Sequence, residues 1–129
     1  MGTTMWSREC KFRLDKSNQQ MAYEKIQELF KKKGDIRWYS QSEVEECTNF
    51  KDVMEVCNWY TNYDDEGNCI EIEFIDGNYS DDDLIFEVIA PYVEDDSYIE
   101  MRDETGERWR WVFKNNECRW VYPDYIWNY

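Results

Sequence analysis

The chain has 129 residues, of which 42% are hydrophobic and 18% aromatic, and its formal net charge is −14. That length fits one domain with a sizeable core, and that apolar content argues against a disordered chain. The sequence contains no histidine, which excludes Ser-His-Asp and Cys-His catalysis within it.

The first predicted elements are a strand and a helix. Apolar and basic residues alternate over residues 10–14, which predicts a strand. Ser17 and Gln20 have the spacing of a capping box at a helix N-terminus. An apolar stripe at helical spacing follows, and Gly34 after three lysines is typical of a helix C-terminus. We therefore expect a helix that begins after Ser17 and ends at Gly34.

The next stretch predicts shorter elements. Residues 36–39 indicate a short strand, and Ser42 is placed to cap a helical turn. Apolar residues at helical spacing predict a helix over about residues 49–59. Isoleucines and a phenylalanine alternate with glutamates over residues 70–74, which predicts a half-buried strand, and residues 76–77 follow as a turn.

The C-terminal part predicts one more helix and three strands. The helix begins at residues 80–83 and is broken near its end by Pro91. Alternation predicts strands over residues 98–102, 109–113 and 118–122, connected as an antiparallel meander. With the earlier elements, this pattern predicts an α+β fold, in which a mostly antiparallel sheet carries about three helices on one face in a single domain.

The charge is concentrated in the middle of the chain. Residues 1–40 carry a net charge of +4, residues 41–105 a net charge of −19, and residues 106–129 a net charge of +1. Only Lys51 and Arg102 oppose the acids of the central segment. A surface built from this segment projects a negative field, which repels nucleic acid and attracts a basic protein surface.

Three acidic clusters in the central segment are candidate partner-binding sites. Residues 81–83 precede a helix, where the helix dipole favours carboxylates, but three in a row exceed what capping needs. Residues 94–96 follow that helix, where the dipole opposes negative charge, so either a solvated loop or a binding role explains them. The third cluster lies before the strand at 70–74. The candidate residues are Asp64, Asp65, Glu66, Asp81, Asp82, Asp83, Glu94, Asp95 and Asp96.

The sequence gives little evidence for a metal site or for catalytic residues. The five cysteines are an odd number without a CxxC pair, which favours reduced, structural thiols over a disulfide framework or a zinc site. Residues 64–68 match only part of a calcium-binding loop, and a hairpin turn explains them better. Neighbouring carboxylates of the glycosidase type are unavoidable among 29 acidic residues. We expect no catalytic residue, no metal and no cofactor.

Three tryptophans lie on one face of neighbouring predicted strands. Trp109, Trp111 and Trp120 on such a face either stack nucleic-acid bases or form a core beneath a helix. Arginines alternate with these tryptophans and so face the other way, which means that aromatic and cationic groups do not converge. The pattern therefore favours the core.

The C-terminal third resembles a known class of proteins. Residues 91–113, PYVEDDSYIEMRDETGERWRWVF, and the later VYP resemble small acidic proteins carried by phages and mobile elements of low-GC Gram-positive bacteria. The resemblance rests on residues 98–100, 106–107 and 109–113. It implies an association with phage biology, where some small acidic proteins inhibit host defence, including anti-CRISPR proteins that imitate nucleic acid.

Charge and resemblance together favour a non-enzymatic inhibitor. We expect it to bind and block a basic, nucleic-acid-handling host-defence protein such as a CRISPR effector, with carboxylates in place of phosphates. The alternative is a structural or accessory protein of a phage or mobile element that docks, or forms a homodimer, through its aromatic sheet. Neither hypothesis includes direct contact with nucleic acid or a membrane.

The expected location is the cytoplasm, which is that of the host cell if the protein is phage-encoded. No apolar run in the sequence is long enough to span a bilayer, and the first 16 residues lack the apolar core of a signal peptide.

Overall fold

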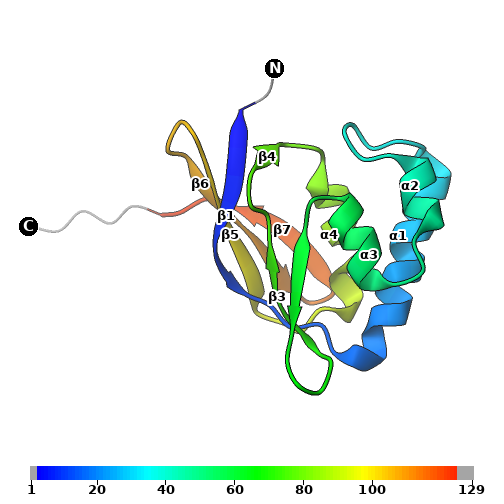
Figure 1. Cartoon of the computed structure of the whole chain (residues 1–129). Coiled ribbons are helices and arrows are strands. Elements are labelled where there is room, and N and C mark those ends of the chain that lie inside the picture. The colour runs from blue at the N-terminus through cyan, green and yellow to red at the C-terminus, as the bar shows by residue number, and fades with distance from the viewer. Residues whose placement is uncertain (1–2, 125–129) are drawn as a thin grey trace, which may run out of the picture.

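The computed structural model describes residues 3–124 and places a layer of strands against a layer of helices (Figure 1). In chain order the elements are β1 (Thr4–Lys11), the 3-10 helix η1 (Lys16–Asn18), α1 (Gln19–Lys33), α2 (Gln41–Glu46), α3 (Phe50–Val56), β2 (Tyr60–Tyr63), β3 (Cys69–Glu73), β4 (Gly77–Asn78), α4 (Asp82–Ile89), the 3-10 helix η2 (Ala90–Tyr92), β5 (Ser97–Asp103), β6 (Arg108–Lys114) and β7 (Glu117–Val121).

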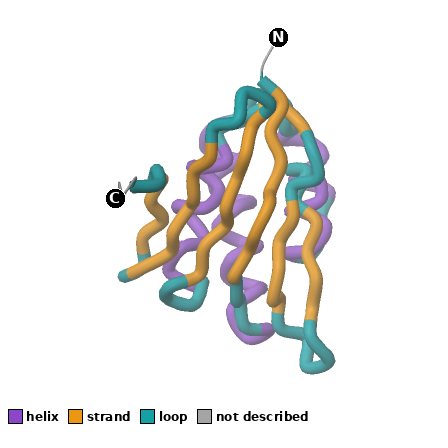
Figure 2. The backbone as a smooth tube through the Cα atoms, turned by 90° about the vertical axis from the view of Figure 1, so that its left-hand side faces the viewer, coloured by secondary structure: helices purple, strands orange, loops and turns teal. Residues whose placement is uncertain are grey.

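Five strands form the main sheet in the order β4-β1-β5-β6-β7, and every neighbouring pair is antiparallel. The β2–β3 hairpin continues this layer beside β1. The Ser7 amide donates to the Phe74 carbonyl at 2.8 Å, and Leu14 forms a bridge with Cys69. Figure 2 views the sheet from the face that no helix covers, and the helices lie behind the strands. The predicted α+β class, with helices on one face of an antiparallel sheet, is confirmed.

The core is an aromatic cluster between the two layers. The Trp59 ring lies 5.0 Å from the rings of both Phe74 and Phe86, and 6.0 Å from that of Trp111, as measured between centroids. All four side chains are fully or almost fully buried. Burying a large apolar side chain contributes about 1.5–3 kcal/mol, and edge-on aromatic pairs add about 0.5–1.5 kcal/mol each. This cluster therefore holds α4, the β3 end and β6 together.

Several predicted strands are confirmed, and one lies elsewhere. Strands β3, β5, β6 and β7 match the predicted segments closely. The first strand covers Thr4–Lys11 instead of residues 10–14, because its pairing with β5 begins at Met5 and ends at Lys11. The strand predicted at 36–39 is wrong, since Ile36 and Tyr39 form only an isolated bridge. Strand β2 was not predicted, because its sequence YTNY lacks apolar alternation.

The helix ends also differ from the sequence prediction. The proposed capping box at Ser17 and Gln20 is wrong, because η1 occupies residues 16–18 and no side chain caps α1. Ser40, and not Ser42, caps α2: its hydroxyl accepts from the Glu43 amide at 3.4 Å. Gly34 does end α1, with a φ of 80° and its amide donating to the Phe30 carbonyl at 2.8 Å.

The outer face of the main sheet, which no helix covers, is basic. Strands β1, β5, β6 and β7 direct seven cations and three carboxylates to this face, a formal net charge of +4. The cations are Arg8, Lys11, Arg102, Arg108, Arg110, Lys114 and Arg119, and the carboxylates are Glu9, Glu100 and Glu117. Since the whole chain carries −14, the rest of the chain carries −18, and all of its charged residues but the buried Asp82 contribute to its surface.

One pair on this face brings like charges together. Arg102 and Arg108 are direct cross-strand partners, an arrangement that costs stability. We expect Arg108→Glu to create a cross-strand ion pair with Arg102 and to raise the free energy of unfolding by about 0.2–1 kcal/mol. Urea denaturation measures this change. The control is Arg119→Glu, which breaks the 3.1 Å ion pair with Glu117 and should not stabilise. A loss of stability in Arg108→Glu would contradict the expectation.

Candidate partner-binding surfaces

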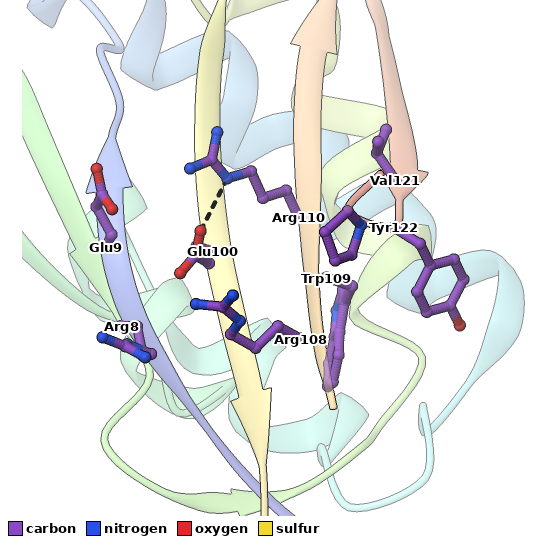
Figure 3. Close-up of a pocket in the computed structure, with 9 residues that line it drawn as sticks. Arg8, Glu9, Glu100, Arg108, Trp109, Arg110, Val121 and Tyr122 are labelled. Carbon is purple, nitrogen blue, oxygen red and sulfur yellow. Dashed lines mark hydrogen bonds and ion pairs between the residues drawn. The ribbon is translucent and has the colours of Figure 1, made fainter. Parts of the chain in front are cut away.

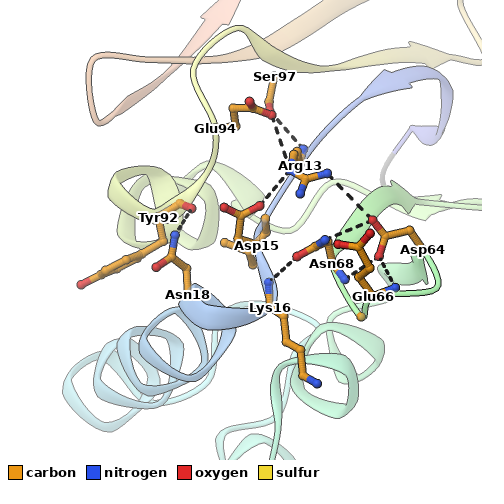
Figure 4. Close-up of polar contacts among 12 residues, drawn as sticks. Arg13, Asp15, Lys16, Asn18, Asp64, Glu66, Asn68, Tyr92, Glu94 and Ser97 are labelled. Carbon is orange, nitrogen blue, oxygen red and sulfur yellow. Dashed lines mark hydrogen bonds and ion pairs between the residues drawn. The ribbon is translucent and has the colours of Figure 1, made fainter.

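Arg13 gathers acidic side chains from three separate segments (Figure 4). Its Nε lies 2.8 Å from Asp15 Oδ1 and 4.0 Å from Glu94 Oε2, and its Nη1 lies 3.9 Å from Asp64 Oδ2. Two of the acidic clusters predicted from sequence therefore meet in space. We name this group the loop-end cluster. Its members are Asp15, Asp64, Asp65, Glu66, Glu94, Asp95 and Asp96.

Within the loop-end cluster, Asp64 organises the hairpin loop between β2 and β3. Its Oδ1 accepts from the amides of Glu66 and Asn68 at 3.0 and 2.9 Å, and its Oδ2 accepts from Asn68 Nδ2 at 3.1 Å. These hydrogen bonds lower the pKa of Asp64, and the bond from the Asn68 side chain has the largest effect. Gly67 completes the turn with a φ of 88°. The Asp64 carboxylate is thus occupied by hydrogen bonds within the loop, while Asp65 and Glu66 remain exposed.

Residues 94–96 form the turn that leads into β5. The Glu94 amide donates to the Arg13 carbonyl at 2.9 Å, and Asp95 Oδ1 accepts from the Asn115 amide at 3.1 Å. Asp96 has a φ of 71° and lies 3.7 Å from Lys114 Nζ. All three carboxylates are exposed, so they stay accessible to a partner while the backbone around them is fixed.

The Asp81–Asp83 run does not join the loop-end cluster. It begins α4, whereas residues 94–96 follow the far end of that helix, about 12 Å away for eight helical residues. Asp81 pairs with Arg37 at 3.0 Å, and Asp83 accepts from the Tyr79 hydroxyl at 2.8 Å. These two carboxylates are half-buried.

Asp82 corrects the sequence prediction, because it is 0% exposed and cannot touch a partner. Its Oδ1 accepts from the Tyr39 hydroxyl at 2.7 Å and from Trp59 Nε1 at 3.2 Å. Its Oδ2 has no hydrogen-bond partner among the described residues. Burial raises the pKa of Asp82 to about 6, although both hydrogen bonds act to lower it. Asp82 is a core residue that the sequence does not distinguish from its two neighbours.

A second acidic surface, absent from the sequence prediction, surrounds Cys47. Burial and the negative charges of nearby carboxylates raise the pKa of the Cys47 thiol. These carboxylates are Asp52, Glu46, Glu43 and Glu55, which we name the acidic helix face because they lie on α2 and α3. Of the four, only Glu55 has a cation within 4.0 Å among the described residues, at 3.3 Å from Lys51 Nζ. Glu43 with Glu46, and Asp52 with Glu55, are each three residues apart, which places both side chains of a pair on one helix face. This spacing is present in the sequence, but the consecutive acids elsewhere are more conspicuous.

The tryptophan face belongs to the core, as the sequence favoured. Trp109 and Trp111 are 5% and 1% exposed, and Phe86 of α4 packs 4.8 Å from Trp111. Trp120 stacks on Trp109 at 4.9 Å and is 36% exposed at the sheet edge. The alternative hypothesis, docking or dimerisation through the aromatic sheet, therefore loses most of the surface on which it relied.

No protein family, curated protein or solved structure matches this chain. Within residues 3–124, no three His, Cys, Asp or Glu side chains are grouped as metal ligands, and no helix has the length and apolarity that crossing a membrane requires. The function must therefore be argued from the surfaces themselves.

The buried carboxyl of Asp82 makes stability depend on pH. Because its pKa is raised from 3.8 to about 6, the folded state holds a proton that the unfolded state releases. The stability that this proton provides is present below pH 4 and is lost as the pH rises through 6. We expect wild type to lose about 2 kcal/mol relative to Asp82→Asn between pH 4 and pH 7. Urea denaturation across this range measures the difference.

The control for this experiment is Asp65→Asn, which changes an exposed loop carboxylate. Its unfolding free energy should follow the wild-type pH dependence. Parallel curves for wild type and Asp82→Asn would contradict the assignment of the buried proton to Asp82.

The Cys47 thiol reports the field of the acidic helix face. We expect neutralisation of Glu43, Glu46 and Asp52 with Gln, Gln and Asn to lower the pKa of Cys47, because it removes three of the charges that raise it. The pH dependence of alkylation by iodoacetamide, read by mass spectrometry at Cys47, measures this pKa. Neutralising Asp95 and Asp96 instead is the control and should leave it unchanged. An unchanged pKa in the first variant would contradict the assignment.

Proposed function

We propose that this protein binds and blocks a basic surface of a nucleic-acid-handling protein, such as a host-defence effector of the CRISPR class, without catalysing a reaction. The observation that supports the proposal is the separation of charge. The outer sheet face holds seven of the 15 cations and three carboxylates, so the rest of the surface, without the buried Asp82, carries a net charge of −17. A basic cleft that normally holds phosphates attracts such a surface.

The acidic helix face and the exposed members of the loop-end cluster supply the contacts. Carboxylates form charge-assisted hydrogen bonds with arginine and lysine, the same groups that hold phosphates. The carboxylates come from rigid helices and from turns that backbone hydrogen bonds fix. Little ordering entropy is then lost on binding. Opposed fields also accelerate the encounter and make it depend on salt.

Exposed apolar side chains lie beside further carboxylates outside the acidic helix face and the loop-end cluster and would anchor the partner. Tyr60 and Ile70 are exposed on the β2–β3 hairpin, and Tyr60 is the direct cross-strand partner of Glu73. Trp38 is 64% exposed and lies against the Asp81 end of α4, where its Nε1 donates to the Tyr79 carbonyl at 3.2 Å. Tyrosine and tryptophan are the side chains that most often dominate binding energy at interfaces.

The test is capture from a lysate of a Gram-positive host at about 50 mM and about 500 mM salt, followed by competition with RNA. We expect wild type to retain a basic nucleic-acid-binding protein at low salt and to release it at high salt or on addition of RNA. Glu43→Lys with Glu46→Lys should reduce retention at least tenfold, because repulsion replaces attraction.

The matched control is Glu107→Lys with Asp124→Lys. This variant changes the net charge equally, and both positions are exposed, Glu107 in the turn before β6 and Asp124 after β7. The β6 end of the sheet lies away from α2 and α3 (Figure 1). It should retain the partner as wild type does. Retention that survives high salt, or that falls equally in both variants, would contradict phosphate mimicry by the acidic helix face.

A further inference from the structure

The basic outer face contains a pocket of about 520 Å³ between β1, β5, β6 and the segment after β7 (Figure 3). Its polar side is formed by Arg8, Arg108 and Arg110 with Glu9 and Glu100. Arg108 and Arg110 extend from β6 across β5 toward Glu100. This volume lies within the range of about 300–1,000 Å³ that is usual for small-molecule sites.

The positive charge of the pocket is largely uncompensated. Arg110 Nε pairs with Glu100 at 3.0 Å. Within the part of the chain that the structure describes, Arg8, Arg108 and the adjacent Arg102 have no carboxylate within 4.0 Å. Glu9 instead accepts from the Tyr98 hydroxyl at 2.8 Å. The three arginines and two glutamates that line the pocket leave a net charge of +1, and Arg102 beside Arg108 brings the net charge of this site to +2.

Folding does not explain this arrangement. Arg102 and Arg108 face each other directly across β5 and β6, which destabilises a sheet. Solubility does not need them either, because the chain already carries −14. The sequence has 29 carboxylates, yet none of those described pairs with Arg8, Arg102 or Arg108. This indicates that their counter-ion comes from outside the chain.

The other wall of the pocket is apolar. It is formed by Val121, Tyr122 and Pro123. A ligand that fits both walls has an anionic head and a flat, partly apolar body. Guanidinium planes also stack on rings, as the guanidinium of Arg110 does on Tyr98 at 4.1 Å from the ring centroid.

We propose that this pocket binds a phosphate monoester attached to a planar ring system, the chemical class of a nucleoside monophosphate. A phosphate monoester carries about −1.5 to −2 charges at pH 7 and three acceptor oxygens, which matches the net charge of +2 and the forked donors of arginine. The ring lies against the apolar wall. A nucleic-acid strand fits less well, because each internal phosphodiester carries one charge and the remaining surface repels a long polyanion.

Isothermal titration calorimetry with AMP tests the proposal on the full chain. We expect saturable binding of one AMP per chain. Arg108→Ala and Arg8→Ala should each weaken binding at least about tenfold. Arg108→Lys should restore part of the loss, because it keeps the charge without the bidentate fork. Arg119→Ala is the matched control. It lies on the same face but outside the pocket and should bind AMP as wild type does.

Three further probes separate the sources of affinity. Adenosine should not bind, because it lacks the phosphate. Inorganic phosphate should bind at least about tenfold more weakly than AMP, because it lacks the ring. An oligothymidylate without a terminal phosphate should bind more weakly than AMP. Equal affinity for phosphate and AMP, tighter binding of the oligonucleotide, no heat from AMP at concentrations on the order of 1 mM, or equal losses in Arg108→Ala and Arg119→Ala would each overturn the proposal.

Discussion

The position of Trp59 is the constraint on which the rest of the structure depends. Its ring contacts Phe74 after β3, Phe86 on α4 and Trp111 on β6, and its Nε1 donates to Asp82. One side chain thus joins the hairpin, the helical layer and the main sheet. The packing also holds a carboxyl group inside the protein, although ionising that group there costs about 3 kcal/mol at neutral pH. The first residue of α4 is therefore fixed in place by the core and not by helix capping.

This core determines where the charges lie. Strand side chains alternate, so the residues of β6 that fill the core, Trp109 and Trp111, force Arg108 and Arg110 to the outer face. Helices cover only the inner face, and their solvent sides carry the carboxylates of α2 and α3. The separation of a basic sheet face from an acidic remainder is thus a consequence of strand periodicity and of one-sided helix packing.

The sequence predicts what local periodicity controls and misses what tertiary contacts decide. Alternation was enough to place β5, β6 and β7 and to assign their faces, and lysines before Gly34 were enough to end α1. The YTNY strand forms only because β3 pairs with it, and no local pattern separates the buried Asp82 from Asp81 and Asp83. Residues 64–66 and 94–96 meet beside the segment around Arg13, whose carbonyl accepts from the Glu94 amide and whose neighbour Leu14 pairs with Cys69. The same limit applies to the basic pocket, whose arginines come from separate strands and whose apolar wall includes residues after β7.

The two charged surfaces act independently of each other. Helices α2 and α3, which carry the acidic helix face, lie on the side of the sheet away from its outer face (Figure 1). The path between the two surfaces through the surrounding solvent is longer than the thickness of a helix with its side chains, about 10 Å, and so exceeds the Debye length of about 8 Å at physiological ionic strength. Exposed charges on one surface are thus largely screened from a ligand at the other. A strongly acidic protein can therefore present a local site for an anion, and net charge alone is a poor guide to what either surface binds.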